Sequence, residues 1–298
     1  MPLLYVYKSI EVSYVLRLEE IICSIVFLKC YLKVVKGFRV LKILVTGGAG
    51  FIGSHLCEFL ASKEGFDVWS IDNYSTGSVA NHISNVTYIE CDTSDIDKAI
   101  KFSPDWVFHL GEYSRVEQSF FDMERVWESN KNGTFKVLQF CLKHKSKLIY
   151  AGSSTKFGDG GLGRSQSPYA WTKASNTELV KNFGDWFGLN YVITYFYNAY
   201  GPREISTGKY ATLIAIYAQR FKEGLPLGVV SPGTQERNFT HVKDIVSGLF
   251  LIARNGEGDD FGIGSEESFS ILEIARMFGG PIEMLEKSTH GECSFRDI

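Results

Sequence analysis

The sequence of 298 residues predicts an α/β fold with a doubly wound parallel sheet, followed by a smaller, mostly helical C-terminal region. Short runs rich in Val, Ile, Phe and Tyr alternate with helix-length segments between residues 42 and 200, as in a parallel sheet covered by helices. A glycine-rich turn separates the first run from the first helical segment. After residue 200 this alternation ends, and loops containing Gly and Pro separate the helical segments.

The first 41 residues differ from the rest of the chain, and we expect them to form an N-terminal extension outside the core fold. The apolar segment Ile21 to Leu28 is followed by Lys29, whereas a membrane span needs about 20 apolar residues. An amphipathic helix or a misassigned start is the favoured interpretation, and a weak membrane anchor is the alternative. No stable membrane insertion is expected.

Six apolar runs between residues 42 and 200 are predicted strands. Their nearly continuous apolar character indicates burial on both faces, as in a parallel sheet. The strands are predicted at 42–46, 67–72, 86–92, 105–111, 147–152 and 191–198, and the helices between them at 51–63, 126–144 and 169–187.

The segment after residue 200 is predicted to lie over the carboxyl edge of the sheet. Helices are expected at 210–222 and 244–253. A third helix follows Ser270, which forms a capping box with Glu273, and Gly279 or Gly280 ends it.

Composition excludes several classes of function. The net charge of −3 and a pI of about 6.1 give no electrostatic reason to expect nucleic acid or an anionic membrane as a partner. The six cysteines are scattered without a C-x-x-C pair or a nearby His cluster, so neither a metal site nor disulfides are expected. Reduced thiols of this kind are typical of a cytoplasmic protein.

The segment ILVTGGAGFIGSHL predicts a phosphate-binding turn. Gly47 permits the tight turn, Gly50 allows the backbone to approach a pyrophosphate, and Gly53 lets the helix pack close to the sheet. The first residues of the helix, Phe51 and Ile52, bring backbone N–H groups toward the phosphate charge. A strand before the turn and a helix after it favour a Rossmann-type dinucleotide site over a flexible loop.

Acidic residues at two predicted strand ends indicate which dinucleotide binds. Asp72 lies nineteen residues beyond Gly53, where a carboxylate accepts hydrogen bonds from both ribose hydroxyls and repels a 2′-phosphate. NAD is therefore favoured over NADP. Asn73, the next residue, is also a predicted cofactor-binding residue. Asp92 ends the next strand and could contact the adenine, although it could equally cap the following helix.

The segment SPYAWTK combines a helix start with a Tyr-x-x-x-Lys pair. Ser167 is the predicted N-cap and Pro168 the first helical residue, so Tyr169 lies in the first turn. Lys173 follows at i+4, on the same helix face. The ammonium group and the helix N-terminus both stabilise a phenolate, so Tyr169 is a candidate general base for a sugar hydroxyl. Alone, the pair could be a surface tyrosine beside a solvated lysine.

A hydroxyl-rich segment, SSTKFG, follows the strand predicted at 147–152. Ser153 lies just past the strand end, at the edge where ligands bind in such sheets. Its hydroxyl could bind the same substrate oxygen as Tyr169. Ser154 and Thr155 remain alternatives on this reasoning.

Six motifs occur in the order found in one family: TGGAGFIG, Asp72, the Ser153 segment, YAWTK, YNAYGPRE and RNFTHVKDIVSG. From about Lys42 onward the chain resembles the extended short-chain dehydrogenases/reductases that act on nucleotide sugars, most of all the UDP-glucose 4-epimerases. The resemblance implies a NAD-binding Rossmann domain at 42–200 and a substrate-binding region at 201–298.

The resemblance also implies roles for individual residues. Counting back from Gly158 selects Ser153 as the family's Ser/Thr beside Tyr169 and Lys173. Asn130 matches an asparagine near the nicotinamide. Asn198 resembles a residue that contacts the sugar or its phosphate. Arg237 resembles an arginine that grips the diphosphate, with a surface ion pair as the alternative.

The family reaction is a 4-epimerisation. Tyr169 would remove a proton from the C4 hydroxyl of a nucleotide-activated hexose as the C4 hydride passes to NAD. A transient 4-keto sugar turns over in the pocket, and the hydride returns to its other face. A UDP-hexose is the favoured substrate, and the resemblance leaves a homodimer open.

Among the departures of the chain from the family, two concern charged residues at a strand end and the C-terminus. Glu112 and Arg115 follow the strand predicted at 105–111, where small apolar residues are frequent, and they could set substrate choice or pair with each other. Family members also continue beyond the C-terminal SFRDI, so a truncated C-terminus is expected.

Other functions remain open. A 4,6-dehydratase needs an acid and a base directly after Ser153, where this chain has Ser154 and Thr155. A decarboxylase or a reductase is a further alternative. A protein that binds NAD without catalysis is an alternative of a different functional class. The presence of Ser153, Tyr169 and Lys173 argues against it, because a protein that only binds NAD does not need these three residues.

Overall fold

The computed structural model describes residues 39–286, without the side chains of residue 156 and residues 158–162. The described residues exclude nearly all of the predicted extension at 1–41. They also exclude the last twelve residues, so the prediction of a truncated end lies outside them. Within the described range no helix is long and apolar enough to cross a membrane.

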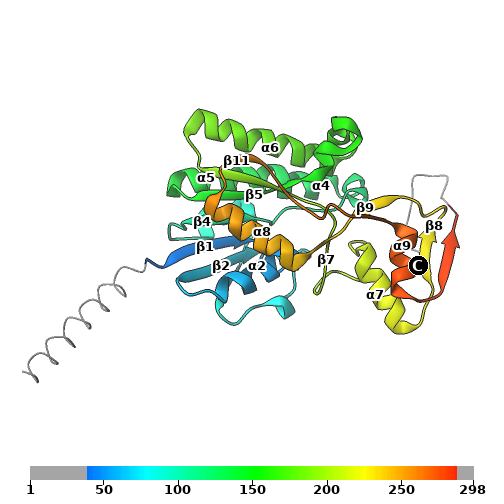
Figure 1. The fold of residues 1–298 in the computed structure, drawn as a ribbon. Helices are drawn as coiled ribbons and strands as arrows, with labels where there is room; N and C mark the ends of the chain where they lie inside the picture. The colour runs from blue at the N-terminus through cyan, green and yellow to red at the C-terminus, as the bar shows by residue number, and fades with distance from the viewer. Residues whose placement is uncertain (1–38, 287–298) are drawn as a thin grey trace, which may run out of the picture. The chain divides into compact units, whose positions relative to one another are not determined.

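A seven-stranded parallel sheet forms the centre of the fold, in the order β11-β6-β5-β4-β1-β2-β3 (Figure 1). The Rossmann-type doubly wound α/β fold is thus confirmed, and so are all six predicted strands. The strands are β1 (Leu41–Thr46), β2 (Phe66–Asp72), β3 (Val86–Glu90), β4 (Trp106–His109), β5 (Lys147–Ser153), β6 (Tyr191–Phe196) and β11 (Gly258–Ile263).

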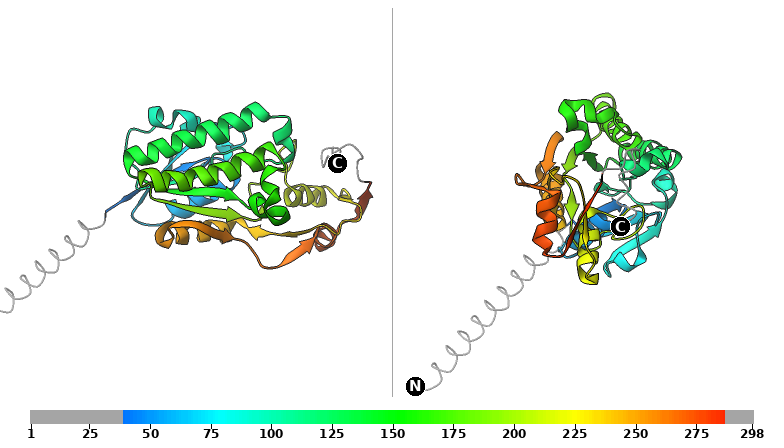
Figure 2. Two further views of the ribbon diagram at one scale, coloured as in Figure 1. Left: turned by 90° about the horizontal axis from the view of Figure 1, so that it is seen from above. Right: turned by 90° about the vertical axis from the view of Figure 1, so that its right-hand side faces the viewer.

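Helices cover both faces of this sheet (Figures 1 and 2). On one face α2 (Phe51–Ala61) and α8 (Val242–Asn255) pack side by side, and their apolar residues form one core with Ile43, Val45 and Phe108. On the other face α3 (Ile96–Ala99), α5 (Thr134–His144) and α6 (Pro168–Phe187) cover a second core. Burial on both faces explains why the strand sequences are almost uniformly apolar.

The helix predicted at 126–144 begins earlier and is irregular. It comprises α4 (Met123–Val126), a π-helical turn η4 (Trp127–Gly133) and α5. Such turns inside longer helices occur frequently at functional sites. Here the turn contains Asn130, whose side chain is fully buried.

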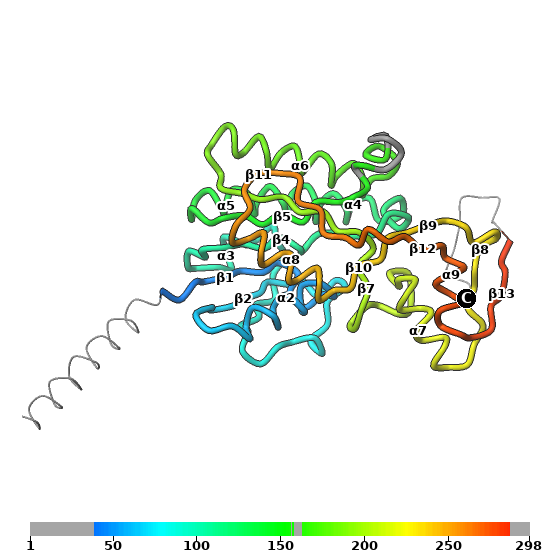
Figure 3. Tube along the Cα trace, in the orientation of Figure 1, coloured from blue at the N-terminus to red at the C-terminus, as the bar shows by residue number. Residues whose placement is uncertain are grey.

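The smaller region contains α7 (Leu213–Glu223) and α9 (Ile271–Phe278) around a third core, which includes Tyr217, Leu227 and Ile274 (Figure 3). The predicted capping box of Ser270 and Glu273 is confirmed, and Gly279 ends α9. Strands contribute more than the prediction of a mostly helical region allowed. They form the pairs β8 (Leu227–Val230) with β13 (Ile282–Leu285), β9 (Glu236–Asn238) with β12 (Ser268–Ser270), and β7 (Ala199–Tyr200) with β10 (Thr240–His241).

The segment that contains α8 and β11 differs from the prediction. The prediction assigns residues 201–298 to the smaller region, whereas β11 pairs with β6 and α8 packs on α2. The sequence of β11, GDDFGI, lacks the β-branched run that marks the other strands, so the local pattern does not reveal its place in the large sheet. The limits of the predicted domains therefore remain a prediction.

Candidate active site

A cavity of about 590 Å³ opens at the carboxyl ends of the central strands. Its walls include residues at the ends of β1 and β4. The strand order reverses here, because β1 pairs with β2 on one side and with β4 on the other. Ligands of open α/β sheets bind at such a reversal. The predicted site residues that line the cavity are Gly47, Gly50, Phe51, Ile52, Gly53, Asp72, Asn73, Asp92, Ser153, Tyr169, Lys173 and Asn198.

The glycine turn has the geometry that the sequence predicted. Gly47 adopts a φ of +75°, which favours glycine. A Cβ atom on Gly53 would lie 2.1 Å from the carbonyl oxygen of Gly47, so only glycine fits there. Gly50 caps α2 without a side-chain hydrogen bond, which leaves the helix N-terminus open toward the cavity. The turn is therefore suited to a pyrophosphate.

Asp72 lies beside this turn at the end of β2. Its carboxylate accepts hydrogen bonds from the backbone N–H groups of Ala49, at 2.9 Å, and Tyr74, at 2.8 Å. Burial raises the pKa of Asp72, and these two donors oppose the increase. Its position in the cavity wall suits contact with ribose hydroxyls.

Asp92 is a helix cap, and it also lines the cavity, so the predicted contact with the adenine remains a prediction. It accepts a hydrogen bond from Ser94 N–H at 2.9 Å and so caps the short helix η2 (Thr93–Asp95). It also accepts one from Asn73 Nδ2 at 2.9 Å, and both residues line the cavity. The glycine turn, Asp72 and the pair of Asn73 and Asp92 together suit a NAD molecule.

Tyr169 and Ser153 meet in the cavity. Ser167 caps α6 by accepting a hydrogen bond from Ala170 N–H at 3.0 Å, which places Tyr169 in the first turn as predicted. The Tyr169 hydroxyl donates to Ser153 Oγ at 3.2 Å. Thr155 also contacts Ser153 Oγ, at 2.9 Å, but only Ser153 has a hydrogen bond to Tyr169. The geometry thus favours Ser153 among the three hydroxyl residues.

Lys173 lies one turn further along α6, on the same side of the cavity. Its ammonium group donates to the backbone carbonyl of Ala151 and forms an ion pair with Glu112. The Lys173 and Glu112 side chains are 6% and 3% exposed, respectively. Lys173 is thus held as a cation inside the wall of the site.

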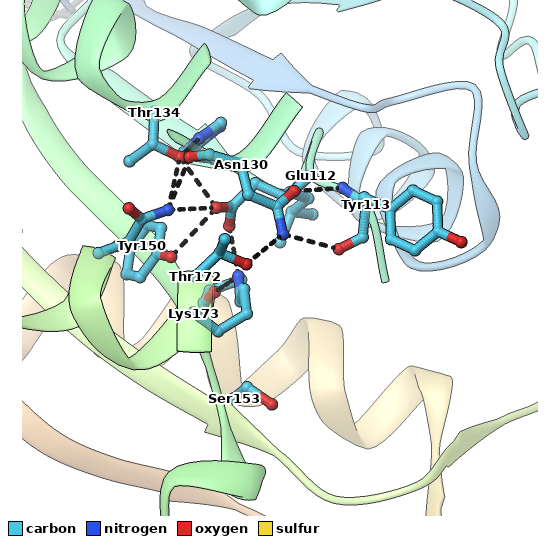
Figure 4. A network of polar contacts seen from close by, with 12 residues as sticks. Glu112, Tyr113, Asn130, Thr134, Tyr150, Ser153, Thr172 and Lys173 are labelled. Carbon is cyan, nitrogen blue, oxygen red and sulfur yellow. Dashed lines mark hydrogen bonds and ion pairs between the residues drawn. The ribbon is translucent and has the colours of Figure 1, made fainter. Parts of the chain in front are cut away.

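Glu112 is the centre of a buried polar network (Figure 4). Its Oε1 accepts hydrogen bonds from Thr134 Oγ1 at 2.9 Å, Asn176 Nδ2 at 3.0 Å and the Tyr150 hydroxyl at 3.2 Å. Burial alone would raise the pKa of Glu112, but the Lys173 charge and the hydrogen bonds outweigh it and hold the pKa below its usual value. The pairing of Glu112 with Arg115 that the sequence allowed is absent, since Lys173 is its ion-pair partner.

Asn130 supports this network rather than lining the cavity. Its side-chain oxygen accepts from Tyr113 N–H at 2.7 Å, and its Nδ2 donates to Thr172 Oγ1 at 3.1 Å. Its backbone carbonyl accepts from Asn176 at 2.7 Å. The π-helical turn therefore joins the loop after β4 to α6, and a position of Asn130 near the nicotinamide remains what the resemblance implies.

The two predicted substrate residues have different positions. Asn198 lines the cavity, and its Nδ2 donates to the Asn238 carbonyl at 2.9 Å. Arg237 is exposed on β9, donates to the Glu236 carbonyl at 2.8 Å and is not among the residues that line the cavity. Arg237 lies in β9, which pairs with β12, and its predicted role at the diphosphate remains a prediction.

Arg115 is a cavity residue that joins the two regions. Its Nε and Nη2 donate to the Tyr210 carbonyl at 2.9 and 2.7 Å, and burial lowers its pKa. Tyr210, Thr134 and Asn176 were not identified from the sequence. Only Asn176 carried a signal, since it follows Lys173 by three residues on α6.

A doubly wound sheet, an open glycine turn and a Ser-Tyr-Lys set define a NAD-dependent enzyme of the short-chain dehydrogenase/reductase class. Residues 43–264 match the model of the NAD dependent epimerase/dehydratase family. The chain belongs to this family, and its cofactor is NAD.

Relatives within the family catalyse different reactions. The chain is 32% identical over 253 residues to a UDP-N-acetyl-alpha-D-glucosaminuronate decarboxylase of Bacillus cytotoxicus, covering 79% of this chain and 78% of the relative. It is 27% identical over 273 residues to a dTDP-D-glucose 4,6-dehydratase of Dictyostelium discoideum, covering 79% and 61%.

Among solved structures, the UDP-glucose 4-epimerase of Thermotoga maritima with UDP-glucose is similar, with a TM-score of 0.77 and 27% identity. This match covers 83% of the present chain and 85% of the epimerase.

Proposed function

We propose that the protein epimerises a nucleotide-activated hexose at C4 through a transient 4-keto intermediate. The observation that carries this proposal is the hydrogen bond between Tyr169 and Ser153 inside the cavity, with Lys173 beside them. Ser153 would hold the C4 oxygen while Tyr169 takes its proton. NAD supplies the hydride acceptor and donor, so the oxidation at C4 is reversed within one catalytic cycle.

The state of Glu112 disfavours a 4,6-dehydratase. Elimination of water needs an acid and a base at the sugar, and Ser154 and Thr155 carry no carboxyl group. Glu112 lines the cavity, but its carboxylate is buried in an ion pair with Lys173. An anion whose oxygens already accept hydrogen bonds is a poor general acid.

A decarboxylase is the second candidate, because the decarboxylase from Bacillus cytotoxicus is 32% identical to this chain. Oxidation of a hexuronate at C4 gives a β-keto acid, which can lose its carboxylate without a further acidic residue. The same Ser153 and Tyr169 would serve this oxidation, so the substrate decides between the two reactions.

Incubation of the purified protein with UDP-glucose, UDP-galactose and their N-acetylated forms tests the proposal. We expect interconversion of a C4 pair, measured by chromatography of the nucleotide sugars. Release of carbon dioxide from a UDP-hexuronate without any interconversion would instead favour the decarboxylase. Bound NAD without turnover of any of these sugars would favour a non-catalytic protein.

Several expectations remain proposals alongside this one. They are the UDP nucleotide, a role of Arg237 at the diphosphate, the cytoplasmic location, the domain limits and the homodimer. Exposed apolar side chains on neighbouring helical segments, Trp127 and Trp171, stack on each other and would suit such a homodimer. Light scattering of the purified protein measures its assembly.

A further inference from the structure

Glu112 places a negative charge in the wall of the catalytic cavity. The residue lies in the loop after β4, at the carboxyl edge of the sheet, and its side chain is 3% exposed. The motif that led to Tyr169 and Lys173 gives no reason for a carboxylate here. Its function is therefore a separate question from that of the catalytic set.

The contacts of Glu112 show that it is ionised. Three hydrogen bonds reach Oε1, from Thr134, Tyr150 and Asn176, and Lys173 contacts Oε2. Each of these four groups is a donor in its contact with Glu112, and a protonated carboxyl would bring a fifth hydrogen atom into this set of donors. The site thus stabilises the carboxylate and not the acid.

The pair of Glu112 and Lys173 is neutral as a whole. With Lys173 alone, the wall next to Tyr169 would carry one positive charge. The nicotinamide ring is cationic in NAD⁺ and neutral in NADH, so the charge of this wall affects the two forms differently. The low exposure of both side chains reduces screening by water and salt.

We propose that Glu112 is a positioning residue that ties Lys173 to the cavity wall and, through its charge, favours bound NAD⁺ over bound NADH. This inference rests on the proposed function, in which NADH exists only while the keto sugar is present. A site biased toward NAD⁺ returns the hydride to the sugar and is ready for the next substrate.

Competition between the two cofactors tests this inference. The full-length protein is equilibrated at alkaline pH with NAD⁺ and NADH at equal concentrations, both in excess over the protein. The protein is then separated from free nucleotide, and the bound nucleotides are quantified by chromatography. In Glu112→Gln the ratio of bound NAD⁺ to NADH should fall about fivefold, because one negative charge near the ring is lost. In Lys173→Met the ratio should rise, because the carboxylate then has no counter-ion.

Tyr150→Phe is the matched control, since it removes one donor to Oε1 and leaves the charge of the pair unchanged. Its ratio should equal that of the parent, and Glu112→Gln combined with Lys173→Met should return toward the parent. A Glu112→Gln ratio equal to that of Tyr150→Phe, or an equal loss of both nucleotides, would overturn the inference.

If Glu112→Gln does not fold, Lys173→Met decides, and an unchanged or lower ratio in that variant overturns the inference. The measurement needs no sugar, so a negative epimerase assay with a shifted ratio would refute only the proposed reaction.

Discussion

His109 extends the network of Glu112 to the first strand of the sheet. Its Nε2 lies 3.0 Å from Thr134 Oγ1, and its Nδ1 lies 2.8 Å from Thr46 Oγ1. Thr134 gives its hydroxyl proton to Glu112, so Nε2 must carry the hydrogen that bonds Thr134. The N–H groups of Leu110 and Gly111 already donate to Thr46 Oγ1, so the Thr46 hydroxyl donates to Nδ1 and His109 is a neutral ring.

Neutral His109 makes the fold sensitive to acid. Burial lowers the pKa of His109 to about 4, below the ordinary value of 6.5, so the unfolded chain binds the proton more readily. Stability should therefore be complete above the ordinary pKa and fall as pH decreases toward 4, by about 2 kcal/mol between roughly pH 7.5 and pH 5.

Urea unfolding at these two pH values measures this loss. His109→Gln removes the titrating group and should show a smaller decrease, although it is less stable at neutral pH. Equal decreases in the parent and in the variant would show that other groups cause the effect.

Tyr169→Phe should strongly reduce turnover while the protein still binds the cofactor. The substitution removes the hydroxyl that donates to Ser153 and leaves the ring in the first turn of α6. We expect turnover to fall by about 10²- to 10⁴-fold, the usual contribution of a general base. Steady-state rates and the amount of bound NAD provide the two measurements. Rates close to the parent would remove Tyr169 from the mechanism.

The first turns of two helices, α6 and α2, determine which of their residues lie at the site. Helix α6 begins at Ser167 and directs Tyr169 and Lys173 toward the cavity, whereas α2 begins at the glycine turn. In both cases the local sequence determines where the helix begins. The side chains that the helix brings to the site follow from that starting point.

Gly53→Ala tests the contact between α2 and the glycine turn. The new Cβ atom would lie 2.1 Å from the Gly47 carbonyl oxygen, so the turn must open or the helix must shift. Affinity for NAD should decrease at least about tenfold, because the backbone donors move away from the pyrophosphate. Calorimetric titration measures it.

Gly262→Ala in β11 is a suitable control, since the atom nearest to its Cβ would be Tyr197 Cε2 at 3.7 Å. This variant should bind NAD like the parent. Unchanged affinity in Gly53→Ala would contradict a role of the turn in binding the cofactor.

The large sheet and the smaller region share the cavity. The glycine turn, Asp72 and the catalytic set come from the strands of the large sheet and the segments that follow them up to α6. Ile205, Thr212 and Phe239 reach the same cavity from the segments that follow β6. Arg115 connects the two sides through the Tyr210 carbonyl. A nucleotide sugar in the cavity should therefore stabilise the segments after β6 more than NAD alone does.

Hydrogen exchange can separate these two effects. NAD should protect the amides of residues 47–53, next to the pyrophosphate, and UDP-glucose added to the NAD complex should further protect residues 205–214. Ligand binding to the folded state slows the opening of the elements it contacts. Residues 271–278 in α9, which do not line the cavity, serve as the internal reference. Equal protection of both segments by NAD alone would contradict this division.

Short motifs predicted the glycine turn and several of the residues that meet in the candidate active site. The glycine spacing, Asp72 and the cap of Ser167 act within a few residues of the chain, so their sequence pattern and geometry correspond closely. The position of Arg237 is harder to predict from a motif, because it depends on how β9 pairs with β12. Likewise β11 joins the large sheet through β6, a contact that its own six residues do not reveal.

The amino-acid pattern determined the parallel sheet, the glycine turn and the placement of Tyr169 and Lys173 on one helix face, because each depends on local backbone geometry and on apolar periodicity. Tertiary structure alone decided the contact of Ser153 with Tyr169, the pairing of Glu112 with Lys173 and the buried chain from His109 to Thr134. These contacts join residues from different strands and helices, and only their packing at one edge of the sheet brings the polar groups within hydrogen-bonding distance.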